Sequence, residues 1–196
     1  MLGLTVTALQ HFTLDTYGHE AWRHAVKAVL GDFQKFEALL VYDDDVVFAL
    51  IKELAESNNR IRKDLEEDIG NYLVSSKHMK SLRRLLRFGG ATFEDFVMSL
   101  GDLNERVDSA LSELNLPTVQ SRQQDDGSYL LRVEDQWSGF ENVIVGILRA
   151  LADDYGVLVL VDVVGHSKGS DEIKVEIIER NFAKGAEFEL IGRAAL

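Results

Sequence analysis

The chain has 196 residues, of which 46% are hydrophobic and none is cysteine, and its net charge at pH 7 is −12. This length suits one domain with a substantial core, and the lack of cysteine excludes disulfides, a thiolate nucleophile and Cys-ligated zinc or iron–sulfur centres. The negative charge argues against nucleic acid or membrane as the main partner, and no apolar run approaches the roughly 20 residues that span a bilayer. Because residues 1–6 carry no basic, cleavable leader, we expect a cytoplasmic protein.

Apolar residues recur at steps of three and four through the first part of the chain, which predicts a series of helices. The expected helices cover residues 2–17, 19–30, 44–54, 61–74 and 81–88. Gly31 is expected to end the second helix, and Asp43 or Asp44 to cap the third. In the fourth helix, the acidic side chains are expected mostly on the outer face: Asp64, Glu66, Glu67 and Asp68.

A longer amphipathic helix is expected to begin at Phe93, with Thr92 as its cap. Its apolar stripe includes one polar position, Asn104, which lies four residues after Leu100 and three before Val107. A buried amide without partners costs about 1–3 kcal/mol, so this residue calls for an explanation.

Proline at 117 is expected to stop the long helix, and alternating patterns then predict strands. The expected elements are strands at 118–124 and 128–134, a helix at 140–155, and strands at 157–164 and 172–179. Residues 125–127 suit a hairpin turn and residues 165–170 a polar turn. The fold class is therefore α+β: a helical N-terminal lobe followed by a β-β-α-β-β antiparallel sheet flanked by helices.

Several segments, taken in order, resemble the heme-NO/oxygen-binding (H-NOX, HNOB) sensor family. They are Asp15-Thr-Tyr-Gly-His-Glu-Ala-Trp22, Tyr42-Asp-Asp-Asp45, the run 87–103, Leu116-Pro117 and the helix 139–148. The resemblance covers roughly residues 1–180 and implies one H-NOX-like domain over 1–196. Its helical lobe would span about 1–60 and its ligand-pocket lobe about 61–185. It further implies heme as cofactor and a role in NO or O₂ sensing and signal transduction, as in bacterial-type sensors.

The residues that the family uses to hold heme differ in this chain. The position of the family's axial histidine holds Asn104, and the Tyr-x-Ser-x-Arg positions that hold the heme propionates have Val133, Asp135 and Trp137. A carboxamide oxygen is a poorer donor to ferrous iron than imidazole, and an aspartate repels a propionate that an arginine would bind. The other pocket positions that match the family are Leu100, Leu103 and Pro117.

Two other histidines, His11 and His78, are the candidate substitutes for the lost ligand, because helices on either side of an H-NOX-like pocket would carry them. The alternative, that all five histidines are structural or on the surface, stays open. The basic residues of 77–87 could contact an acidic partner or a phosphate, or form a solvated face. No Ser-His-Asp set or metal-binding pattern is present, so the chain is not expected to be an enzyme.

Three functions follow from these observations. The first is a non-enzymatic sensory or ligand-binding module whose hydrophobic pocket works without His-ligated heme and holds a fatty acid or another hydrophobic molecule. The second is a heme gas sensor with a substitute axial ligand, and the third is a protein-interaction module with a collapsed pocket. By resemblance, the partner would be a separate signalling protein: a histidine kinase or a cyclic-nucleotide or cyclic-dinucleotide enzyme.

Overall fold

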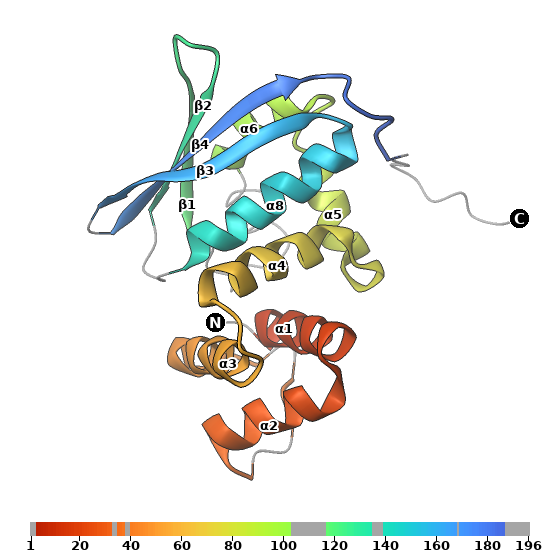
Figure 1. The fold of residues 1–196 in the computed structure, drawn as a ribbon, viewed down its shortest axis with the longest axis vertical. Coiled ribbons are helices and arrows are strands. Elements are labelled where there is room, and N and C mark those ends of the chain that lie inside the picture. The colour runs from red at the N-terminus through yellow and green to blue at the C-terminus, as the bar shows by residue number, and fades with distance from the viewer. Residues whose placement is uncertain are drawn as a thin grey trace, which may run out of the picture.

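The computed structural model describes residues 3–32, 35–37, 40–102, 117–134, 139–167 and 169–186. Helices α1, α2 and α3 form a layer at one end of the molecule, and a four-stranded sheet lies at the other end (Figure 1). Helix α4 lies between this layer and α8, which crosses one face of the sheet. The α+β class expected from the sequence is confirmed.

The first four α-helices are close to their predicted positions. They are α1 (Gly3–Thr16), α2 (Gly18–Leu30), α3 (Asp44–Ser57) and α4 (Arg62–Ser75). Gly31 ends α2 with a φ of 65°, a left-handed angle that glycine adopts without a Cβ penalty. The Asp43 side chain caps α3 by accepting a hydrogen bond from the Asp45 N–H. The apolar faces of these helices pack together into a separate hydrophobic core, in which Val6, Phe12 and Leu50 are fully or almost fully buried.

In the described part of the segment expected as one long helix, the α-helix gives way to a 3-10 turn. After the short helices η1 (Lys77–Met79) and α5 (Lys80–Arg87), helix α6 covers only Phe93–Ser99 and continues as the 3-10 turn η2 (Leu100–Asp102). Thr92 begins α6 with a capping box, as predicted. The Ser99 hydroxyl bonds the Phe96 carbonyl at 2.8 Å, and Gly101 is a poor helix former, so both weaken the α-helical pattern. The later part of that prediction, residues 103–116, lies outside the described residues.

The sheet is antiparallel, as predicted, with strand order β1-β2-β4-β3. Its strands are β1 (Thr118–Gln123), β2 (Tyr129–Glu134), β3 (Leu158–Ser167) and β4 (Ser170–Glu179). The polar turn expected at 165–170 is shorter than predicted, because Gly165, His166 and Ser167 still pair with β4. His166 Nδ1 lies 2.7 Å from Asp171 Oδ1 across this ladder, so polar side chains support the strand ends.

Helix α8 (Phe140–Tyr155) completes the fold between two left-handed glycines, Gly139 and Gly156. Its apolar face forms a second core with the inner face of the sheet and with α6. Helix α4 joins the two cores, since Leu65 belongs to the first and Val74 to the second. Among the helices of the described ranges, none is both long and apolar enough to cross a membrane.

Candidate functional site

The predicted pocket positions fall into two groups. Leu100 of η2 and Val133 of β2 are buried, Val133 completely, and both belong to the core beneath the sheet. Pro117 directly precedes β1. The remaining predicted positions, Leu103, Asn104, Asp135 and Trp137, lie outside the described residues. The structure therefore brings Leu100 and Val133 together as apolar core.

The two candidate substitute ligands, His11 and His78, are in contact with each other. Their rings stack with centroids 4.8 Å apart and planes 11° from parallel. His78 Nε2 lies 3.6 Å from Asp15 Oδ2, and the Tyr72 hydroxyl donates to the same oxygen at 2.7 Å. The hydrogen bond from Tyr72 holds the pKa of Asp15 below its usual range, and the nearby charge of His78 adds a smaller effect in the same direction. The two histidines thus take part in a local cluster that links α1 with α4 and η1.

A buried polar network lies where α4 meets the start of α8, and the sequence reasoning missed it. Glu66, expected on the outer face of α4, is only 3% exposed, so that expectation is wrong for this residue. Its carboxylate accepts hydrogen bonds from Arg62 Nε at 2.7 Å and from Asn142 Nδ2 at 2.9 Å. Asn142 Nδ2 also donates to Glu141 Oε1 at 3.1 Å, and Glu141 Oε2 accepts the Gly139 N–H at 3.0 Å. Two buried carboxylates therefore share one amide.

Gly139 makes room for this carboxylate. A Cβ atom at position 139 would lie 2.2 Å from Glu66 Oε1, and the glycine φ of +105° disfavours any other residue. The Glu66 carboxylate consequently lies at the N-terminus of α8, where the helix dipole favours a negative charge. Burial nevertheless raises the pKa of Glu66, partly offset by its hydrogen bonds to Asn142 and Arg62.

Helices α4 and α8 pack with their backbones in contact. A Cβ at Gly70 would lie 2.1 Å from the Val143 carbonyl oxygen, and a Cβ at Gly146 would lie 2.0 Å from the Glu67 carbonyl oxygen. Arg149 of α8 pairs with Glu67 and donates from Nη2 to the Val161 carbonyl of edge strand β3 at 2.9 Å. The signal available in the sequence was a glycine within each helical pattern, which often marks close packing.

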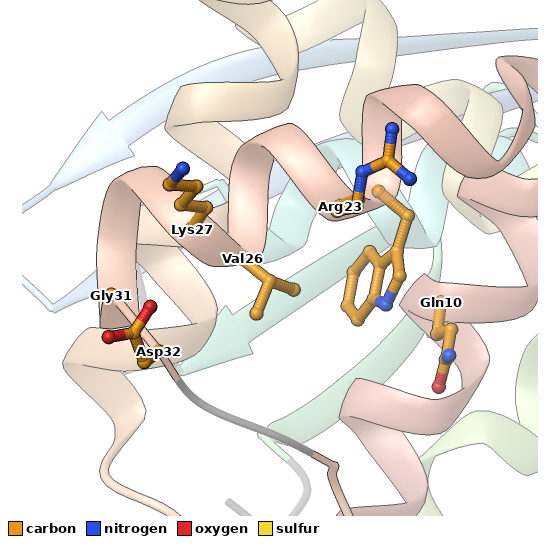
Figure 2. A pocket seen from close by; sticks show the side chains of 7 residues that line it. Gln10, Arg23, Val26, Lys27, Gly31 and Asp32 are labelled. Carbon is orange, nitrogen blue, oxygen red and sulfur yellow. The ribbon is translucent and has the colours of Figure 1, made fainter.

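An open cleft of about 490 Å³ lies between α1 and α2 (Figure 2). Its lining consists of Gln10, Trp22, Arg23, Val26, Lys27, Gly31 and Asp32. Arg23 is paired with Glu20, and none of the predicted site residues lines this cleft. Within the described ranges, no group of three or more His, Asp or Glu residues is arranged to hold a metal ion.

Solved structures with the same architecture are H-NOX proteins. An H-NOX protein from S. oneidensis in the Fe(II)NO state matches with a TM-score of 0.78 at 15% identity, over 90% of this chain and 99% of that one. An oxygen-binding H-NOX domain related to soluble guanylate cyclases matches with a TM-score of 0.72 at 14% identity, over 95% and 100%. The fold is therefore that of the H-NOX sensor domains.

Sequence comparison reaches the same family. The haem-NO-binding (HNOB) family profile matches residues 2–163, so the chain belongs to the haem-NO-binding, or H-NOX, family. Soluble guanylate cyclase 89Db of Drosophila melanogaster is 20% identical over 79% of the chain, and gcy-35 of Caenorhabditis elegans is 25% identical over 78%. The matched part of the chain spans only 23% and 22% of these two cyclases, so it corresponds to a sensor domain and not to the whole enzyme.

Proposed function

We propose that this chain is a non-enzymatic ligand-binding sensor module of the H-NOX fold that works without a histidine-ligated heme. The observation that carries the proposal is the buried Glu66–Asn142–Glu141 network at the start of α8. In the sequence, Gly139 of this network follows positions 133, 135 and 137, which by resemblance would hold the heme propionates. Asn104 stands where the family has its axial histidine, which also supports a function without histidine-ligated heme.

The described residues do not fit a heme at this end of α8. Its propionates carry negative charge and need cationic or neutral donors, as the family's tyrosine, serine and arginine provide. Here Val133 offers no hydrogen-bonding side chain and is completely buried, while Glu66 and Glu141 add two buried carboxylates. An added carboxylate would meet like charge at low dielectric, where repulsion is strongest.

In place of heme, the module would hold an apolar small molecule. A fold whose relatives enclose a porphyrin must either fill that volume with side chains or accept another hydrophobic ligand. Binding would be transmitted to a signalling protein. A cyclase-type partner is supported by the relatives, since the curated matches are soluble guanylate cyclases. A histidine kinase or a cyclic-dinucleotide enzyme is the other class of partner that the resemblance implies.

A heme sensor with a substitute axial ligand is the second candidate, and His11 and His78 are its ligands. In the structure these rings stack on each other, and His78 faces Asp15. Ligation of iron by His78 Nε2 would replace its contact with Asp15 Oδ2. In that case His11→Ala or His78→Ala would abolish a Soret band present in the wild type.

Native mass spectrometry of the purified protein, followed by organic extraction, tests the proposal. A bound apolar molecule of defined mass, without heme, is the expected result. A stoichiometric mass increment equal to heme would favour the second candidate. A protein with no bound molecule would contradict both and favour the interaction module with a collapsed pocket.

A further inference from the structure

We infer that the outer face of α5 is a docking surface for an extended acidic segment of a partner protein, whose carboxylates meet Lys80 and Arg84 and whose apolar side chain meets Phe88. These three exposed residues, four positions apart along the chain, form the α5 stripe. The inference rests on the part of the proposed function in which the module acts through a separate signalling protein. It does not depend on which small molecule the module binds.

Positive charge is concentrated in the part of the chain that contains α5. Residues 69–93 include five lysines and arginines and no aspartate or glutamate, although the whole chain has a net charge of −12. In other described parts of the chain, cations lie beside acidic side chains, as Arg60 does beside Asp68. A carboxylate that meets the outer face of α5 must therefore come from outside residues 69–93.

The inner face of α5 holds the helix against α8. Helix α5 lies beside the C-terminal end of α8 (Figure 1), where Arg83 Nη2 donates to Asp154 Oδ1 at 2.9 Å. The Arg87 guanidinium lies 3.6 Å from the centre of the Tyr155 ring. Leu86 is only 3% exposed and belongs to the core beneath the sheet. These contacts fix α5 on the molecule and leave the α5 stripe on its outer side.

The stability of the helix does not account for the α5 stripe. Arg84 lies in the last turn of α5, where the helix dipole favours a cation. Lys80 is the first residue of α5, where the dipole disfavours positive charge, and it forms no ion pair within the part of the chain that the structure describes. Phe88 is 61% exposed. Arginine and aromatic side chains are typical anchors of protein interfaces, so this combination indicates a docking surface.

The spacing of the α5 stripe suits an extended segment. Residues four apart in a helix are about 6 Å apart along its axis, and alternate residues of an extended chain are about 6.6–6.8 Å apart. A partner segment with the pattern acid-x-acid-x-apolar can therefore face Lys80, Arg84 and Phe88 in register. Nucleic acid or an anionic membrane fits less well, because the negative charge of the whole chain repels a large polyanion.

Two rhodamine-labelled peptides with blocked C-termini test the surface: Glu-Ser-Glu-Ser-Phe and its neutral counterpart Gln-Ser-Gln-Ser-Phe. Fluorescence anisotropy measures their binding at an ionic strength below about 0.1 M, where the Debye length exceeds about 10 Å. The wild type should bind the acidic peptide at least about tenfold more tightly than the neutral one, equivalent to about 1.4 kcal/mol. Added salt should reduce this preference.

Variants of the α5 stripe separate its two contributions. Lys80→Ala/Arg84→Ala should weaken binding of the acidic peptide at least about tenfold and reduce its dependence on salt, because two cations are removed. Phe88→Ala should weaken both peptides by a similar factor and leave the salt dependence unchanged. The matched control, Arg23→Ala/Lys52→Ala, removes two exposed cations from α2 and α3 and should change binding less than about twofold.

The outcomes decide between occupants of the surface. Equal binding of the two peptides, or an equal loss in the control variant, overturns the assignment to the α5 stripe and leaves the ligand-binding function standing. Self-association of the wild type that Lys80→Ala/Arg84→Ala lacks would make a second copy of this chain the occupant. Tighter binding to phosphatidylserine vesicles than to the acidic peptide would make the occupant a membrane, and either result would overturn the acidic segment.

Discussion

Replacement of Gly146 by alanine is the most direct test of the α4–α8 contact that places Glu66 against α8. The new Cβ would lie 2.0 Å from the Glu67 carbonyl oxygen and 2.9 Å from the Asn71 nitrogen, while ordinary contacts begin at 3.4 Å. Both obstacles are backbone atoms, which cannot rotate away as a side chain can. The two helices must therefore move apart or bend.

The size of the effect follows from two opposing contributions. Overpacking of a close contact costs about 1–3 kcal/mol, and the backbone obstacles place this site at the upper end. Alanine recovers up to about 1 kcal/mol of helix propensity relative to glycine. The net loss should be about 2 kcal/mol, which for a chain of this length lowers the melting temperature by about 4–8 °C.

Thermal unfolding followed by circular dichroism measures this change, with Gly101→Ala as the matched control. A Cβ at Gly101 meets only the Val119 carbonyl at 3.6 Å, so that variant should melt near the wild type. A Gly146→Ala protein as stable as the wild type would show that α4 and α8 are not in backbone contact. It would also remove the geometric basis for the burial of Glu66.

Three further results are expected. Because burial raises the pKa of Glu66 above its ordinary 4.5, the native state holds this proton more tightly than the unfolded chain does. The contribution of Glu66 to the free energy of unfolding therefore decreases as pH rises from 4.5 through the raised native pKa. Urea unfolding of Glu66→Gln should lack this pH-dependent contribution. A difference in unfolding free energy between wild type and variant that does not change with pH would contradict the raised pKa. Arg149→Ala should lower the free energy of unfolding in urea by about 1 kcal/mol, because it removes the hydrogen-bond donor of the Val161 carbonyl. Arg23→Ala removes an exposed ion pair and should change the free energy of unfolding little. Hydrogen bonds from the side chain and the N–H of Ser128 lower the pKa of Asp126 to about 2. In Ser128→Ala, a carboxyl NMR titration should give a pKa of Asp126 closer to 3.8. An unchanged pKa would refute the role of the Ser128 hydroxyl.

Local signals allowed most of the secondary structure to be predicted from the sequence. Thr92, Gly31 and the Asp125-Asp126-Gly127 turn act through bonds within a few residues, and the structure confirms each of them. The α-helix that begins at Phe93 was expected to continue through residues 100–102, because its apolar stripe runs past Ser99. A hydroxyl bond to Phe96 and a glycine at 101 ended the α-helix there in spite of that periodicity.

The polar network at the start of α8 could not be predicted in the same way. Glu66 lies among charged neighbours in the sequence, and its burial depends on Asn142, 76 positions away. The contact of His11 with His78 likewise depends on how α1 packs against α4, which no periodicity encodes. By contrast, the substitution of asparagine at 104 was visible at once, because a resemblance to a family compares single positions.

The visible spectrum of the protein expressed with a heme precursor, beside that of Asn104→His, tests the central claim most directly. The proposed function predicts a wild type without a Soret band and a variant that gains one, since imidazole restores a donor for the iron. Adding Glu66→Gln to Asn104→His should increase the heme content further. A wild-type protein that already carries one equivalent of heme would contradict the claim and would place the axial ligand at another residue of the chain.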